Sequence, residues 1–493
     1  MALTQPETVE RWAHDRAIDL WVSFALPDVA AAARDDGARI ARVDETPSSW
    51  AVFEAMREAG IDDVRRVGVL AATPSGLGAG RAAGAQAVVA IAATDAEAAE
   101  LLVVEPDAAV TPAEFPLLYH ERYSSSRLLR PQVLLNPGPA LTTEHVKRAA
   151  AGVDLCHREL EYTILDQRIR DRLRAVAEVG DDWVVALLSG SGTGAAEASL
   201  RAAIRPESRA LVVVNGVYGE RLLAMATRAG IDAVTAEYGW TEPADPDEIG
   251  RLLDSELDVD AVAVVHHETT TGLLNPVEAI ADLASDRGVR VLVDGISSFG
   301  AEELTLEGSG IDFLVCSSNK CLQGLPGAAF VLVSPAGRER LEVVPPTSVY
   351  LDLAGYVRGS EAGSVPFTPA IPALASLDAA LDELLVIGAA EHRRRYAERA
   401  AALDGVLDRL GLEPIVAPAS RSRTVRAVPL PSGVSYERLH DALKQDGYVI
   451  YAGQGRLAPE IFRICCMGAL GPEIIESFGE RLAEELDRAA AVA

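Results

Sequence analysis

The chain has 493 residues, with 45 lysines and arginines against 73 aspartates and glutamates, which gives a formal charge of −28 at neutral pH. This charge disfavours nucleic acid or an anionic membrane as the main partner, and a hydrophobic content of 49% excludes a disordered chain. The sequence shows neither an apolar run long enough to cross a bilayer nor a secretory leader, so we expect a cytoplasmic protein. The length predicts two or three domains.

The cysteines show no pattern that would link them or bind a metal. They are Cys156, Cys316, Cys321, Cys465 and Cys466, an odd number without CxxC or Cys/His zinc spacing. We therefore expect reduced thiols and no metal site.

Up to about residue 118 the sequence is rich in alanine and alternates short apolar runs with helix-forming runs. It predicts a helix at Trp50–Ala59, strands at Val67–Leu70 and Ala87–Ala92, and a glycine-rich turn at Ser75–Gly80. A polar stretch with serines and arginines follows and predicts a linker over residues 119–131. Residues 1–118 should therefore form a separate α/β module.

From residue 132 to 375 apolar strands alternate with amphipathic helices. The predicted strands are Val184–Leu188, Ala210–Val214, Ala261–Val265, Val289–Val293, Phe313–Cys316 and Ala328–Val333. Fully apolar runs separated by helices predict a mainly parallel sheet covered on both faces. Residues 376–493 predict a smaller α+β domain. Its elements are helix-forming sequence up to Leu410, strands at Thr424–Leu430, Tyr448–Tyr451 and Ile461–Cys465, a helix at Tyr436–Asp446, and a closing helix from Pro472.

An aspartate and a lysine follow two of these strands. The strand that ends at Val293 runs into Asp294, and the next predicted strand ends in the turn that carries Lys320. Functional groups gather at the carboxyl ends of parallel strands, so both side chains should lie at one edge of the sheet. A pyridoxal phosphate enzyme needs this pair, because a lysine amine bonds to the aldehyde and a carboxylate keeps the ring nitrogen protonated. Taken singly, Lys320 could be a surface lysine and Asp294 a helix cap.

A glycine-rich segment, Ser189–Glu197, follows the predicted strand Val184–Leu188 and opens a helix. Its backbone N–H groups, its hydroxyls and the positive end of the helix dipole suit an anion. It is not a Walker loop, since no Gly-Lys-Ser/Thr ends it. Nor is it a dinucleotide fingerprint, because the next strand runs into Asn215 instead of an acidic residue. Together with Asp294 and Lys320 it predicts a cradle for the cofactor phosphate.

Several motifs occur in one order along residues 132 to 490. They are Leu134-Leu-Asn-Pro-Gly-Pro139, Asp154-Leu-Cys-His-Arg-Glu159, Ser189-Gly-Ser-Gly-Thr193, Asn215-Gly-Val-Tyr-Gly-Glu-Arg221, His267-Glu-Thr-Thr-Thr-Gly272, Asp294-Gly-Ile-Ser-Ser-Phe-Gly300, Ser318-Asn-Lys-Cys-Leu-Gln-Gly324 and Phe462-Arg-Ile464. This series closely resembles the class V aminotransferases, and within them the 2-aminoethylphosphonate–pyruvate branch. The resemblance implies a fold-type I pyridoxal 5'-phosphate enzyme that moves an amino group from a phosphonate amine to pyruvate.

The resemblance also implies roles for single residues. Lys320 would form the Schiff base, and Asp294 would partner the pyridine nitrogen. Tyr218 and Ile296 would cover the two faces of the ring, and Thr269 would bond the phenolic oxygen. The remaining assignments are Ser191, Gly192 and Thr193 on the phosphate, Ser298 and Asn319 around the cofactor, Thr368 on the phosphate of the neighbouring subunit in a homodimer, and Arg463 on the carboxylate of the amino or keto acid.

Simpler interpretations stay open for some of these residues. Arg463 could be an exposed salt-bridge residue, and Tyr218 could be an ordinary core aromatic. His157 and Arg158 could belong to a phosphonate pocket or to a solvated helix start. The segments Pro345–Leu353 and Phe367–Pro372 depart from the pattern of the phosphonate branch. The amino donor could therefore be a carboxylate such as alanine or serine, with glyoxylate as acceptor. A protein that uses this fold as a non-catalytic scaffold is an alternative to an enzyme.

The N-terminal module resembles the C-terminal half of phosphonoacetaldehyde hydrolase, a haloacid-dehalogenase-type (HAD-like) enzyme. The segments that carry the resemblance are Arg42–Gly60, Val67–Leu70 and Ala79–Gly84. That hydrolase would act on the product of the transaminase. However, residues 1–118 contain no lysine, no DxD-type nucleophile motif and no acidic residue after Val67–Leu70, so nothing would hold Mg²⁺. We expect a degenerate, inert module.

Overall fold

The computed structural model describes residues 132–490 and, before them, residues 20–24, 39–43, 47, 49–61, 67–83, 85, 87–92 and 108–110. Contacts divide the chain into two units, Met1–Pro131 and Gln132–Ala493. The predicted linker at 119–131 lies outside the described residues. None of the helices that the structure describes is long and apolar enough to cross a bilayer.

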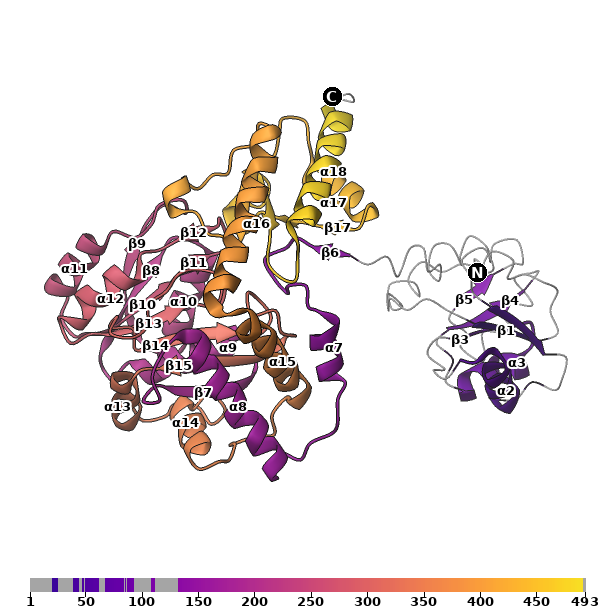
Figure 1. The fold of residues 1–493 in the computed structure, drawn as a ribbon, viewed down its shortest axis with the longest axis horizontal. Coiled ribbons are helices and arrows are strands. Elements are labelled where there is room, and N and C mark those ends of the chain that lie inside the picture. The colour runs from indigo at the N-terminus through magenta and orange to yellow at the C-terminus, as the bar shows by residue number, and fades with distance from the viewer. Residues whose placement is uncertain are drawn as a thin grey trace. The chain divides into compact units, whose positions relative to one another are not determined.

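The first unit contains a five-stranded sheet in the order β2-β1-β3-β4-β5, with every neighbouring pair parallel (Figure 1). Its described strands are β1 (Leu20–Phe24), β2 (Arg39–Val43), β3 (Val67–Ala71), β4 (Ala87–Ile91) and β5 (Ala108–Val110). Its described helices are α2 (Ser49–Ala59) and α3 (Pro74–Ala83). The predicted helix and both predicted strands of this unit are confirmed.

The predicted turn at Ser75–Gly80 is wrong, because these residues lie inside α3. Pro74 suits the first position of a helix, where no N–H is needed. A Cβ on Gly80 would lie 2.9 Å from the Cβ of Val69 in β3. This glycine therefore allows α3 to approach the strand closely, and it does not mark a chain reversal.

The second unit is built on a seven-stranded sheet in the order β7-β15-β14-β13-β10-β8-β9. Its strands are β7 (Val184–Gly190), β8 (Arg209–Val214), β9 (Asp232–Glu237), β10 (Val259–Val265), β13 (Arg290–Asp294), β14 (Phe313–Ser317) and β15 (Gly327–Val333). Neighbours are parallel from β14 to β9, and β15 runs antiparallel to both β14 and β7. The mainly parallel sheet is confirmed. The edge strand β9 escaped prediction because its sequence, DAVTAE, is polar at both ends.

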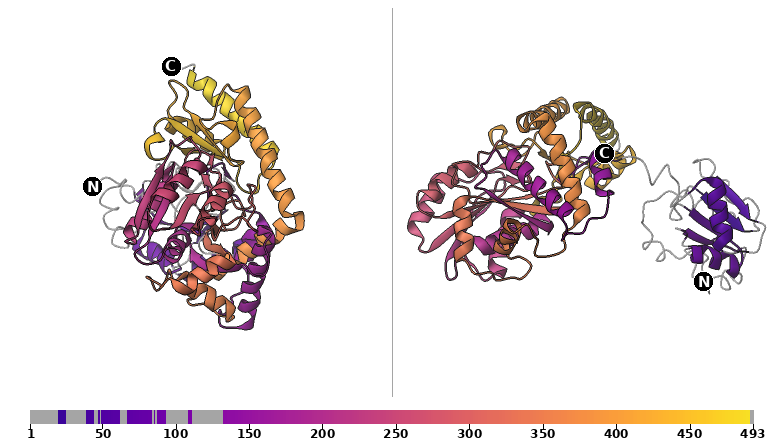
Figure 2. Two further views of the ribbon diagram at one scale, coloured as in Figure 1. Left: turned by 90° about the vertical axis from the view of Figure 1, so that its left-hand side faces the viewer. Right: turned by 60° about the horizontal axis from the view of Figure 1, so that its bottom comes forward.

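Helices cover both faces of this sheet, so the second unit has three layers (Figures 1 and 2). Alternate residues of each strand enter opposite cores, as Leu314 and Val315 of β14 do. One face is covered by α8 (Leu160–Ala177), α11 (Pro246–Ser255), α12 (Val277–Ser285) and α15 (Ile371–Ile387). The other is covered by α9 (Gly192–Ala203), α10 (Val217–Arg228), α13 (Pro335–Val343) and α14 (Leu353–Glu361). Helix α7 (Glu144–Ala150) lies against α15.

The C-terminal part forms a smaller α+β layer with its own core. Its elements are α16 (Ala389–Arg409), β16 (Val425–Pro429), α17 (Tyr436–Gln445), β17 (Tyr448–Val449), β18 (Tyr451–Ala452), β19 (Ile461–Cys465) and α18 (Pro472–Ala490). The helix-forming stretch before Leu410 is divided at Gly388, whose φ of 90° ends α15. The short strand β6 (Val133–Leu134) pairs with β17, so the start of this unit joins its end.

A buried carboxylate ties a strand of the large sheet to the segment after α9 and to helix α13. Asp260 in β10, with a side chain only 2% exposed, accepts hydrogen bonds from the backbone N–H and guanidinium of Arg205 and from Arg340. Arg340 is also buried, with 7% of its side chain exposed. Removing the acid would leave a guanidinium buried without its counter-charge.

We expect Asp260→Asn to destabilise the protein by about 3 to 5 kcal/mol, the usual cost of breaking a buried ion pair. Urea unfolding followed by circular dichroism measures this. Asp254→Asn is the matched control, because it breaks the exposed Asp254–Arg287 pair and should leave the unfolding midpoint unchanged. Equal midpoints for the two variants would contradict the assignment.

Candidate active site

The predicted aspartate and lysine lie at the same edge of the large sheet. Asp294 is the last residue of β13, and Lys320 lies in the turn after the neighbouring parallel strand β14. The hairpin of β11 (His267–Glu268) and β12 (Leu273–Leu274) follows β10 and reaches the same edge. Side chains from three adjacent strand ends therefore meet there.

Asp294 is a buried carboxylate with room for one more partner. Its side chain accepts the N–H of Ile296 at 3.0 Å on Oδ1, and its other oxygen makes no hydrogen bond within the described part of the chain. Burial raises the pKa of Asp294 to about 6, against the opposing effects of the Ile296 N–H and the charges of Lys320 and Arg221. A protonated nitrogen at the free oxygen would stabilise the charged form.

The lysine is positioned by the segment that begins the second unit. The ammonium of Lys320 donates to the carbonyl of Pro137. Next to it, a Cβ on Gly138 would lie 2.7 Å from Cδ of the lysine, and the φ of Gly138 is +107°. Only glycine fits there, which explains the motif Leu134–Pro139 that the sequence alone had left without a role.

The glycine-rich segment forms a turn and a helix N-terminus. Strand β7 ends at Gly190 and α9 begins at Gly192, with Ser191 as the N-cap; its hydroxyl makes no capping bond within the described residues. Arg221 donates to the hydroxyl of Thr193 at 3.3 Å. A helix N-terminus, two hydroxyls and a guanidinium suit a phosphate. Arg221 lay inside a recognised motif, but its role was not predicted.

Ile296 packs directly against this cradle, since a Cβ on Gly192 would lie 2.5 Å from its Cδ1. Tyr218 stands at the start of α10, half-buried, with the guanidinium of Arg221 4.6 Å from its ring centroid. Tyr218 is thus not an ordinary, fully enclosed core aromatic.

Glu268 is the residue that sequence reasoning missed. It is fully buried and accepts N–H groups from Tyr218 and Gly219, both at 3.2 Å, together with the N–H and hydroxyl of Thr270. Burial raises the pKa of Glu268, and these hydrogen bonds oppose the shift. A Cβ on Gly216 would lie 2.3 Å from its carboxyl carbon. Glu268 therefore fixes the N-terminus of α10 and the backbone of Tyr218.

Arg463 lies in β19 and is 5% exposed, so the interpretation as an exposed salt-bridge residue is wrong. It donates to the carbonyls of Ala452 and Thr269 and to the side chain of Gln454, and it forms no ion pair with any described residue. The hydroxyl of Thr269 is buried and has no partner in the described ranges. A buried guanidinium without a carboxylate is suited to an anionic ligand.

The contacts of the other predicted site residues do not by themselves indicate a role. The hydroxyl of Ser298 donates to the carbonyl of Gly295 within the turn after β13, and the carbonyl of Asn319 accepts the N–H of Ala140. Thr368 is exposed, on the segment before α15. His157 and Arg158 lie in the turn that precedes α8, and their two interpretations stay open.

Comparison with known proteins identifies the family. The sequence profile of the family described as "Aminotransferase class-V" matches residues 141–464. The chain belongs to the class V aminotransferases. It is 37% identical to a protein of Burkholderia thailandensis over 69% of this chain and 93% of the relative. A protein of Syntrophobacter fumaroxidans is 36% identical over 70% and 93%. Both are named 2-aminoethylphosphonate–pyruvate transaminase.

Solved structures agree with this membership. A Thermus thermophilus aspartate aminotransferase of subgroup IV has a TM-score of 0.67 and 32% identity, over 72% of this chain and 99% of its own. A Nostoc alanine–glyoxylate aminotransferase has a TM-score of 0.68 and 28% identity, over 73% and 96%. The fold is that of fold-type I aminotransferases, and the protein is a pyridoxal phosphate enzyme. Two groups fit that cofactor. One carboxylate oxygen of Asp294 and the buried hydroxyl of Thr269 have no hydrogen-bond partner among the described residues.

We expect Lys320→Ala to lose both transamination and covalent attachment of the cofactor, because no other amine reaches this edge within the described structure. Borohydride reduction followed by peptide mass spectrometry measures the attachment. Lys444→Ala, on the exposed side of α17, is the matched control and should behave as the parent protein. Cofactor trapped on a residue other than Lys320 would refute the assignment.

Glu268→Gln should weaken cofactor binding by about tenfold or more while Lys320 remains able to attach it. The amide keeps the size of the side chain but removes the charge and one acceptor pair, so the N-terminus of α10 loses its anchor. Titrating the apoprotein with pyridoxal phosphate measures the affinity. Glu220→Gln, at an exposed position of the same helix, is the control. Unchanged affinity in Glu268→Gln would show that the carboxylate has no positioning role.

Proposed function

We propose that this protein transfers the amino group of 2-aminoethylphosphonate, or a close phosphonate amine, to pyruvate, giving phosphonoacetaldehyde and alanine. The names of relatives that match over 93% of their own length support this substrate pair. The structural observation that carries the proposal is Arg463, a buried guanidinium free of any carboxylate among the described residues and beside Thr269. It suits the carboxylate of pyruvate, because two parallel N–H donors match two carboxylate oxygens.

The residues of the site then have separate tasks. Bound pyridoxal phosphate supplies an aldehyde that bonds to amines and a ring that accepts electrons. Asp294 holds a proton at the ring nitrogen, and the amine of Lys320 takes and returns the proton at the substrate carbon. Tyr218, at the start of α10, and Ile296, against Gly192, would cover the two faces of the bound ring. Ser191, Gly192 and Thr193 hold the phosphate, with Thr269, Ser298 and Asn319 around the rest of the cofactor.

A second candidate is a class V transaminase that uses a carboxylate donor with glyoxylate. The likeness to the Nostoc alanine–glyoxylate aminotransferase supports it, and Arg463 would serve the same role there. The scaffold alternative is set aside, because the family and the named relatives make the protein an enzyme.

The amino donor is tested by a screen with pyruvate as acceptor. The proposal expects alanine to form from 2-aminoethylphosphonate much faster than from serine, and alanine with glyoxylate to react poorly. Chromatography measures the alanine formed in the reactions with pyruvate and the glycine formed in the reaction of alanine with glyoxylate. The opposite ranking would establish the carboxylate-donor candidate instead.

Arg463→Ala should weaken the binding of pyruvate by about 2 to 4 kcal/mol, the range of a lost charged hydrogen bond, and it should affect KM more than cofactor binding. Steady-state kinetics with pyruvate as the varied substrate measure this. Arg409→Ala, which removes an exposed pair with Glu476, is the control. An unchanged KM for pyruvate would remove Arg463 from the site.

We further propose a cytoplasmic homodimer in which Thr368 reaches the partner's cofactor phosphate. Thr368 lies on the surface, and Val349 and Tyr350 are 83% and 45% exposed, which suits a covered interface. All five cysteines are free, which suits a reducing compartment. The sequence predicts the boundary between the cofactor domain and the small domain at 375/376; we propose to move it to the end of α15, because Leu377, Leu381 and Leu384 pack in the core of the large sheet.

For residues 1–118 we propose a degenerate HAD-like module without hydrolase activity. The parallel order β2-β1-β3-β4-β5 suits an α/β remnant of that kind. Strand β3 ends at Ala71 and is followed by Ala72 and Thr73, so no carboxylate stands at its carboxyl end. Hydrolysis there would require a metal-held acid and a lysine.

The purified full chain, with magnesium present, should release no inorganic phosphate from phosphonoacetaldehyde above the uncatalysed rate. A colorimetric phosphate assay measures the release, with an authentic hydrolase as positive control. Phosphate formed in proportion to protein concentration would overturn the proposal of an inert module.

A further inference from the structure

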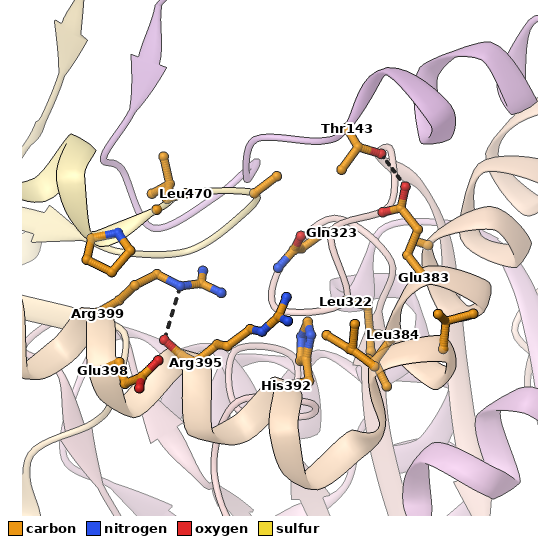
Figure 3. Close-up of a pocket in the computed structure, with 16 residues that line it drawn as sticks. Thr143, Leu322, Gln323, Glu383, Leu384, His392, Arg395, Glu398, Arg399 and Leu470 are labelled. Carbon is orange, nitrogen blue, oxygen red and sulfur yellow. Dashed lines mark hydrogen bonds between the residues drawn. The ribbon is translucent and has the colours of Figure 1, made fainter.

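A cavity of about 600 Å³ lies behind the lysine turn, outside the site described above. It is bounded by the end of α15, by α16, by residues 469–472, and by Leu322 and Gln323 of the turn that carries Lys320 (Figure 3). The cavity has apolar walls and two arginines, Arg395 and Arg399, on one side.

Arg399 is a buried charge without an acidic partner. It is 5% exposed, and its guanidinium donates to the carbonyls of Arg395, Cys466 and Gly468 while lying 4.3 Å from the ring centroid of Tyr396. Within the described structure it forms no ion pair. Neutral carbonyls satisfy only part of a guanidinium, and an uncompensated buried charge is costly.

Arg395, one helical turn before Arg399, adds a second positive charge at the same place. In Figure 3 both guanidinium groups point into the space between α16 and the chain opposite. Arg395 is half-exposed and is bonded, among the described residues, only through Nε to Glu391 at 3.1 Å. Like charges four residues apart repel each other on a helix, so an anion between them would relieve both.

The acids that line the cavity do not supply this anion. Glu398 pairs with Arg394, and Glu383 accepts the hydroxyl of Thr143 at 2.7 Å. The amide of Gln323 donates to the hydroxyl of Tyr396 at 3.3 Å. The remaining walls are apolar, with Leu322, Leu384 and Leu470 among them.

We propose that this cavity is a binding site for a small carboxylate with a short alkyl chain. Arg395 and Arg399 bind the carboxylate, because planar guanidinium groups match its two oxygens, and the leucine walls take the alkyl part. The site borders the lysine turn: the imidazole Nε2–H of His392 and the hydroxyl of Tyr396 donate to the carbonyl of Cys321 at 3.0 and 3.1 Å.

Isothermal titration of the full-length holoenzyme with hexanoate tests the proposal. We expect hexanoate to bind saturably and to bind about tenfold or more weakly to Arg395→Gln and to Arg399→Met. Inorganic phosphate should bind more weakly than hexanoate. Arg409→Gln, on the same helix, is the matched control and should bind as the parent protein does, because Arg409 pairs with Glu476 and neither residue lines the cavity. Arg395→Gln keeps the test decisive if Arg399→Met fails to fold, because Arg395 is half-exposed.

Arg463→Ala separates this cavity from the active site. Hexanoate binding should persist in that variant, since Arg463 lies in β19 and does not line the cavity. Absence of binding to the parent protein would overturn the proposal, as would binding that Arg395→Gln leaves unchanged or that Arg463→Ala abolishes. Equal affinity for inorganic phosphate would show that the ligand class is wrong.

Discussion

The register of three parallel strands is the constraint on which the site depends. Asp294 at the end of β13 is paired with Val265 of β10 on one side and with Val315 of β14 on the other. The strands therefore end nearly level, and the segments that follow them bring Glu268, Asp294 and Lys320 to one edge. A slip of one residue would turn the Asp294 side chain to the opposite face of the sheet, away from the side of Val265 and Val315.

Two buried carboxylates at this edge show how the same group serves different purposes. Burial raises the pKa of each. Glu268 is surrounded by N–H and hydroxyl donors that complete its hydrogen bonding, so it stabilises the backbone beneath Tyr218. Asp294 accepts one N–H, so part of its hydrogen-bonding capacity remains for a cation. The number of local donors separates the structural acid from the one available for chemistry.

The sequence predicted the elements whose signal is local. Apolar runs located the buried strands, and the residues after them, Asp294 and Lys320, could be placed at strand ends. Contacts between distant segments carried no such signal: the pairing of β6 with β17, the carbonyl of Pro137 at Lys320, and Glu268 beneath Tyr218. The misread turn at Ser75–Gly80 has the same origin, because the glycines there serve the packing of a helix on β3, and packing is invisible to turn propensity.

The turn that carries Lys320 is held from two sides by segments far from it in sequence. On one side the lysine ammonium bonds to Pro137, and the Asn319 carbonyl accepts the N–H of Ala140. On the other side His392 and Tyr396 of α16 bond to the Cys321 carbonyl. A carbonyl only accepts, so His392 donates from Nε2. Burial lowers the pKa of His392 to about 4, which favours the neutral imidazole at physiological pH. Because α16 packs on α18 of the small layer, the position of the lysine is set jointly by the sheet edge and the C-terminal layer.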